Sequence, residues 1–308
     1  MEAAHGPLAT TYQDTMASLC TSVAAAVVGS AAMCAAYVGC LYFHAGYRRE
    51  GGRAPDRDDP RVVKERFVRV GVASAVAPCI ALGVATLFPH SCSVPNDQSL
   101  WTWFGLMAPN VALGTVLPLG LTMVLFLGPL VMSWLDRDRT TSIELQVRER
   151  LRDLEDDGLL VLRNLVVGPV TEEWVFRACM CPLLFGAGLP DVANVFTSAF
   201  IFGCAHVHHI FDSDVNYLTV AVQFTYTSLF GAYSSYLFLR TGHLLGPLVA
   251  HIFCNFMGLP AFARVPNHRY RRTLTAAFVL GLGSFIALTT LDAIYRPALF
   301  GSMFWKEH

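Results

Sequence analysis

Apolar runs long enough to cross a bilayer recur along the whole chain, which leaves little room for a soluble fold. A helix needs about 20 apolar residues to cross the hydrocarbon core. Of the 308 residues, 54% are hydrophobic and 15% are charged, against about 25% charged in soluble domains. The sequence predicts an all-α, polytopic transmembrane bundle of about eight spans, the third with a kink or a short broken piece because it holds Pro109 and Pro118. The expected spans cover approximately residues 18–43, 68–88, 105–134, 160–186, 192–211, 217–239, 243–259 and 273–298.

Lys and Arg are distributed unevenly between the loops, and this predicts how the bundle lies in the membrane. No basic residue precedes the first span, whereas eight lie between Arg48 and Arg69. Further arginines occur in the segment 136–158, where we expect an amphipathic helix, and in the loop after residue 260. These three loops share one side of an eight-span chain, so we expect them in the cytosol and both termini on the far side.

The stretch TEEWVFRACM places two glutamates and an arginine inside the fourth expected span. Each ionised residue there costs roughly 2.5–3.5 kcal/mol unless it is paired or hydrated. Glu173 and Arg177 are four residues apart and share a helical face, so we expect them to pair. Glu172 lies about 140° around the helix from Arg177. It is therefore expected to stay unpaired and to be suited to take a proton from water.

Two other expected spans carry polar residues at helical spacing. In FGCAHVHHIF, Phe202, His206 and His209 share one face. In HIFCN, His251 and Asn255 are one turn apart. At about 1.5 Å per residue, the Glu-Glu pair and both histidine motifs lie about 9–13 Å from the expected cytosolic surface. The sequence predicts an intramembrane catalytic cavity, open to the cytosolic side.

The residues in such a cavity are compatible with few types of catalytic chemistry. There is no nucleophile elbow, no Cys-His signature and no H-E-x-x-H motif, and none of the nine cysteines has zinc-like spacing. One free carboxylate with imidazoles and a carboxamide suits hydrolysis of an amide by activated water, with His and Asn donating to the oxyanion. A zinc ion held by Glu172, His206 and His251 is also chemically possible.

At these positions the sequence resembles the type II CAAX prenyl proteases, the Ras-converting endopeptidases of the intramembrane glutamate protease family. The resemblance rests on E-E-x-x-x-R, F-x-x-x-H and H-x-x-x-N, and on longer runs such as GPVTEEWVFRACM, and is strong over about 160–262. It implies an endopeptidase of the endoplasmic reticulum membrane that removes the aaX tripeptide from farnesylated or geranylgeranylated CaaX proteins, such as Ras-type small GTPases. It implies no required metal or other cofactor.

The resemblance also implies individual roles. Glu172 activates the water, Glu173 and Arg177 support it, His206 is the second catalytic residue, and His251 with Asn255 binds the oxyanion. The predicted site therefore has four catalytic and four supporting residues: Glu172, His206, His251 and Asn255, then Glu173, Arg177, Phe202 and His209.

The same intramembrane Glu and His residues leave another class of function open. A proton-coupled transporter or a non-proteolytic scaffold could also use them, although the cluster lies on one side of the bilayer and no inverted pair of broken spans is present. We expect one membrane unit with an N-terminal region 1–158, a catalytic core 159–262 and a C-terminal span and tail 263–308. The expected partners are the lipid bilayer and the prenylated substrate, and the net charge of −1 gives no support for nucleic acid.

Overall fold

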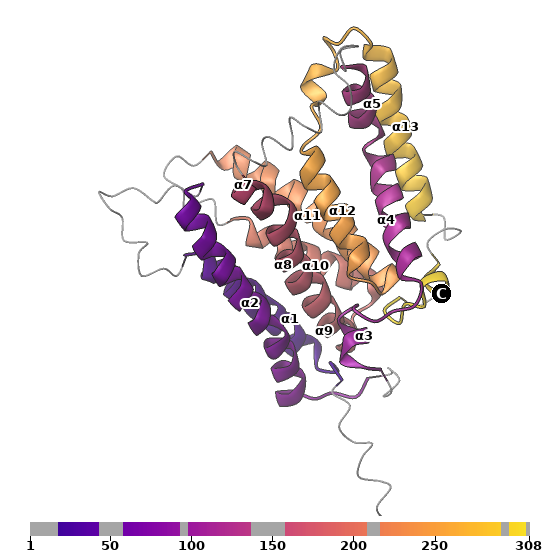
Figure 1. Cartoon of the computed structure of the whole chain (residues 1–308). Helices are drawn as coiled ribbons and strands as arrows, with labels where there is room; N and C mark the ends of the chain where they lie inside the picture. The colour runs from indigo at the N-terminus through magenta and orange to yellow at the C-terminus, as the bar shows by residue number, and fades with distance from the viewer. Residues whose placement is uncertain are drawn as a thin grey trace, which may run out of the picture.

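The computed structural model describes residues 18–42, 58–92, 98–136, 158–207, 216–290 and 296–305. Over these ranges the ordered elements are helices, and the β-type pairing is a single isolated bridge from Thr21 to Pro89. The predicted all-α bundle is confirmed (Figure 1). His209 and nearly all of the amphipathic helix expected at 136–158 lie outside the described residues.

Three single helices are long and apolar enough to cross a membrane: α1 (Val23–Tyr42), α2 (Pro60–Leu87) and α13 (Arg271–Thr290). A fourth candidate is the pair α4 (Val111–Leu125) and α5 (Leu127–Leu135), which is bent by 66°. By length and composition alone, the described residues thus contain up to four such spans, fewer than the eight expected from apolar runs.

The bend between α4 and α5 lies at Phe126, and neither Pro109 nor Pro118 causes it. Pro118 lies inside α4 without interrupting it. Pro129 follows in the first turn of α5, and it has no N–H to donate to the Leu125 carbonyl. The expected third span is thus interrupted, as predicted: residues 104–110, which include Pro109, are not helical, and the bend at Phe126 follows further along.

The fourth expected span is one helical run with two changes of hydrogen-bond spacing. Gly168 and Met180 donate their N–H groups five residues back, to Arg163 and Val175, which is π-helical geometry. The run consists of α7 (Gly158–Leu162), η2 (Arg163–Val167), α8 (Gly168–Glu173), η3 (Trp174–Cys179) and α9 (Met180–Gly186). It runs through the middle of the bundle, with α1 and α2 on one side and α12, α4 and α13 on the other (Figure 1).

The remaining spans near the site are uneven in length. α11 (Tyr217–Thr241) has 25 residues, but α10 (Asp191–Ala205) and α12 (Leu245–Met257) have 15 and 13. Both are shorter than the expected spans 192–211 and 243–259, and shorter than the roughly 20 residues needed to cross the hydrocarbon core. α12 ends at Gly258, whose φ of 68° favours glycine.

Polar contacts join helix ends that border the basic loops. Arg163 forms an ion pair with Asp58 at 2.8 Å, which joins the start of α2 to the start of the 158–186 run. Asp136, at the end of α5, accepts hydrogen bonds from His268 and Arg264 in the loop after α12. The His268 hydrogen bond, followed by the Arg264 charge, lowers the pKa of Asp136. The structure thus connects the loop ends that the positive-inside pattern predicts to share a side.

The other ends of α1 and α2 are joined by a disulfide between Cys20 and Cys92. The sequence did not predict this bond, because the spacing of two cysteines does not reveal their pairing. Disulfides form in oxidising compartments such as the lumen of the endoplasmic reticulum. A position for Cys20 and Cys92 on the side away from the cytosol agrees with the expected orientation, in which the basic loops are cytosolic.

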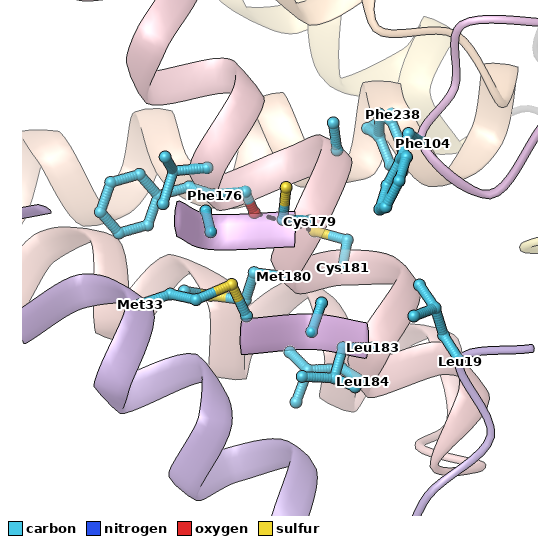
Figure 2. Packing of buried hydrophobic residues seen from close by; sticks show 14 of the residues in the cluster. Leu19, Met33, Phe104, Phe176, Cys179, Met180, Cys181, Leu183, Leu184 and Phe238 are labelled. Carbon is cyan, nitrogen blue, oxygen red and sulfur yellow. Dashed lines mark hydrogen bonds between the residues drawn. The ribbon is translucent and has the colours of Figure 1, made fainter. Parts of the chain in front are cut away.

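The main core surrounds the second half of the 158–186 run. Phe176, Cys179, Met180, Leu183 and Leu184 are fully or almost fully buried. Figure 2 shows these side chains packed with residues of α1 and α11. Packing on several sides holds this run in place, and the run carries both glutamates of the TEEWVFRACM motif.

Candidate active site

The two glutamates lie on α8, a single α-helical segment between the two π segments. π segments are rare and occur frequently at functional sites. The first one has a local cause and a local consequence. Gly168 donates to Arg163, and Pro169 has no N–H, so the Asn164 carbonyl loses its donor within the helix. That free carbonyl accepts a hydrogen bond from Asn255 of α12, with Nδ2 at 2.8 Å.

Glu173 is the buried anchor of the site. Its side chain is fully buried, and its two oxygens meet groups from three directions. Oε1 accepts from His251 Nδ1 at 2.7 Å, and Oε2 accepts from Ser234 Oγ at 2.6 Å. Arg177 Nε lies 3.3 Å from Oε2, which confirms the predicted ion pair. A fully buried carboxylate requires such partners, since removing one side of a buried pair costs roughly 3–5 kcal/mol.

An aromatic layer connects this ion pair to both histidine motifs. The Arg177 guanidinium lies over the Phe202 ring at 4.2 Å and near the Phe230 ring at 5.9 Å. The Phe202 and His206 rings pack edge to face with their centroids 4.8 Å apart, in agreement with their predicted common face. Phe230 lies 4.6 Å from His251. Arg177 thus makes cation–π contacts with this aromatic layer in addition to its ion pair with Glu173.

His251 is held between the two glutamates. Because a carboxylate only accepts, Nδ1 carries the proton that Glu173 binds. In the neutral ring, Nε2 then has a lone pair, and it lies 3.9 Å from Glu172 Oε2. This distance is too long for a direct hydrogen bond. The Glu172 side chain is 22% exposed while that of Glu173 is fully buried, so the two adjacent carboxylates occupy different environments, as helix geometry predicted.

His206 is the residue that ends α10, and it is half-buried. Its Nδ1 lies 2.9 Å from the Phe202 carbonyl oxygen. A carbonyl only accepts, so Nδ1 donates and Nε2 of the neutral ring is left with its lone pair. His206 and His251 therefore share one tautomer, with Nε2 as the atom available for chemistry.

Asn255 is exposed and does not share a hydrogen-bond partner with His251. The sequence predicted that the two side chains converge on one oxygen. In the structure, one N–H of the Asn255 amide is used by the Asn164 carbonyl, and His251 is oriented by Glu173. The second Asn255 N–H remains a donor. The Asn164 contact therefore fixes the direction of the amide without using up its donor capacity.

The predicted catalytic cavity stays a prediction. An open cavity of about 780 Å³ lies elsewhere, lined by residues between Phe262 and Val279, and contains none of the predicted catalytic residues. Within the described part of the chain, no three His, Cys, Asp or Glu side chains are close enough together to hold a metal ion.

Two contributors to the site were missed at the level of sequence. Ser234 binds Glu173 from α11, and nothing in the YSSY stretch distinguishes it from an ordinary helix-packing serine. Asn164 contributes only a backbone carbonyl. Pro169, five residues later, was the available signal, because a proline removes an intrahelical donor.

Comparison with known proteins identifies relatives over most of the chain. Residues 156–257 match the family described as type II CAAX prenyl endopeptidase Rce1-like. CAAX prenyl protease 2 of Homo sapiens is 40% identical over 282 residues, which covers 87% of this chain and 80% of the human protein. Proteins of the same name from Arabidopsis thaliana and Caenorhabditis elegans are 36% and 31% identical, covering 64% and 76% of this chain and 68% and 86% of their own lengths. No solved structure matches the chain.

Proposed function

Because the chain belongs to the type II CAAX prenyl endopeptidase family, we propose that Glu172, together with His251, activates the water that cleaves its substrate. The chain is a membrane-embedded protease of CAAX processing. Its substrates are proteins with a prenylated CaaX terminus, from which it releases the aaX tripeptide. We place the catalytic core at 159–262 and the enzyme in the endoplasmic reticulum membrane.

The observation that carries this proposal is the placement of Glu172 Oε2 and His251 Nε2, 3.9 Å apart. Both atoms are acceptors when the ring is neutral. A water lying to one side of the line between them can reach both at about 2.8 Å. Such a water has its two protons directed at the bases and a lone pair free for the substrate carbonyl. Glu172 is partly exposed, so solvent can supply this water.

Glu173 has a separate task, which is to hold His251. Its buried carboxylate keeps the proton on Nδ1 and stabilises the imidazolium that forms if Nε2 takes a proton, as the Asp does in Ser-His-Asp sites. The protonated ring then donates from Nε2, and this is the state in which His251 serves the oxyanion as the family resemblance implies. Arg177 and Ser234 keep Glu173 in place.

The remaining polar groups complete the reaction. The second N–H of Asn255 is directed by the Asn164 carbonyl and serves the oxyanion. Nε2 of His206 exchanges protons with the attacking water or the leaving amine. The farnesyl or geranylgeranyl chain stays in lipid, since each buried CH₂ contributes about 0.8 kcal/mol. The peptide part then reaches the glutamates from the cytosolic side.

Purified protein in liposomes should release the intact tripeptide from a farnesylated CaaX peptide and leave the unprenylated peptide uncut. After exhaustive chelation, with metal analysis to verify that no metal remains, the cleavage rate should be unchanged, because a carboxylate and an imidazole are sufficient bases. Loss of activity on chelation, with recovery on adding zinc, would establish the zinc-dependent variant instead. No cleavage, together with Glu172-dependent proton flux, would point to the transporter.

A further inference from the structure

A tyrosine of the first helix makes contact with the turn that carries the glutamates. Tyr37, in α1, is 6% exposed, and its Oη lies 2.8 Å from Oγ1 of Thr171, a residue 134 positions later. Thr171 directly precedes Glu172. The Tyr37 ring also packs edge-on against Phe176 at 5.7 Å. Tyr37 lies outside the residues 156–257 that match the family.

The direction of the hydrogen bond follows from the other partners of Thr171. Thr171 Oγ1 donates to the Val167 carbonyl at 2.7 Å. With its own proton used there, it accepts the phenol proton of Tyr37. Val167 is the last residue of the first π segment. The bond therefore ties α1 to α8, between Val167, where the π segment ends, and Glu172.

The π segment that ends at Val167 sets the rotation of α8 relative to the helix before it. A π segment contains one residue more than α spacing requires, so its loss would rotate the side chains that follow it by about 100° relative to those before it. Such a rotation would take Glu172 away from His251 Nε2, which now lies 3.9 Å from its Oε2. A second contact ties this run to α2: Trp174 Nε1 donates to the carbonyl of Ser74, a residue of α2, at 2.8 Å.

We propose that Tyr37 is a positioning residue for Glu172, acting through Thr171 to fix the rotation of α8. This inference rests on the proposed function of Glu172. It makes α1, which lies outside the matched region, a required part of the active enzyme. A tyrosine hydroxyl with a merely structural role would contribute to stability and leave turnover by the folded protein unchanged.

Tyr37→Phe is the decisive variant, because it removes one hydroxyl and keeps the ring against Phe176. We expect kcat for tripeptide release to fall about 10–100-fold with KM unchanged, the scale on which small misplacements act. The matched control is Tyr233→Phe, whose hydroxyl lies 2.8 Å from Thr122 Oγ1 between α11 and α4. The control should lose a similar amount of thermal stability and retain wild-type kcat.

A double-mutant cycle and hydrogen exchange test the route through Thr171. Tyr37→Phe combined with Thr171→Val should be no slower than the worse single variant, because both remove the same bond. Amide exchange over 163–179 should be faster in Tyr37→Phe than in Tyr233→Phe. Wild-type kcat in Tyr37→Phe, or purely additive effects, would overturn the inference. If the wild-type protein cleaves nothing, the proposed function fails, and unchanged exchange over 163–179 would then overturn the positioning claim separately.

Discussion

Glu172→Gln is expected to lower kcat for tripeptide release at least about 10³-fold, since a general base typically contributes 10²–10⁴-fold. The amide has the size of the carboxyl group but cannot take a proton from the water between it and His251. Folding should be spared, because the Glu172 side chain is partly exposed and is not the buried partner of Arg177. The measurement is kcat per folded protein, with the melting temperature taken on the same preparation.

Glu65→Gln is a matched control for this substitution. Glu65 lies on α2, its side chain is 47% exposed, and it pairs with Arg69 one turn away. Its loss should leave both kcat and melting temperature close to wild type, because exposed ion pairs contribute little. Normal turnover by Glu172→Gln would remove Glu172 from the role of base.

Asn255→Ala is expected to lower kcat about 10²–10³-fold with KM little changed, the usual effect of removing one oxyanion donor. The interaction is made in the transition state, so kcat and kcat/KM should fall together. Asn255→Asp should be at least as damaging, because a carboxylate would repel the developing negative charge. Steady-state kinetics with a farnesylated peptide measures both effects.

The alternative role of Asn255 is helix packing through the Asn164 carbonyl, which contributes about 0.6 kcal/mol in a membrane. Asn194→Ala tests that class of effect, because Asn194 Nδ2 donates to the Cys181 carbonyl at 2.9 Å within the core. That control should melt at a lower temperature and turn over normally once folded. If Asn255→Ala behaves in the same way, Asn255 is a packing residue and not a catalytic one.

Helical periodicity was sufficient where the partners lie on one helix. The Glu173–Arg177 pair and the Phe202–His206 contact follow from four-residue spacing, and both are present. Hydropathy predicted the order of the helices for a similar reason, because a long apolar run is recognised from its own residues alone. The different environments of Glu172 and Glu173 also followed from rotation around a single helix.

Contacts between helices were beyond the reach of periodicity. Glu173 binds His251 and Ser234 on two other helices, and spacing within one helix carries no information about such partners. The lengths of α10 and α12 were overestimated, because an apolar run continues past the residue where the helix ends. The bend at Phe126 was not expected, because Pro129 acts on the part of the chain before it, where the Leu125 carbonyl lacks its helical donor.

The π segments were missed because they depend on which carbonyl each N–H selects. Pro169 removes one donor, but a helix can also respond by kinking or by binding water. In this chain the freed Asn164 carbonyl is satisfied by Asn255, a residue of α12 that sequence spacing could not bring to it. The Asn255 hydrogen bond and the first π segment thus stabilise each other, and the sequence alone predicts neither of them.

Single-turnover cleavage of a farnesylated CaaX peptide in H₂¹⁸O tests directly whether Glu172 activates water. With enzyme in excess, the first turnover should place one ¹⁸O atom in the new carboxyl group of the prenylated cysteine, release the intact tripeptide and leave Glu172 unlabelled. An unlabelled cysteine carboxyl group, with ¹⁸O found in Glu172 by peptide mass spectrometry, would show that the carboxylate attacks the peptide itself and would contradict water activation.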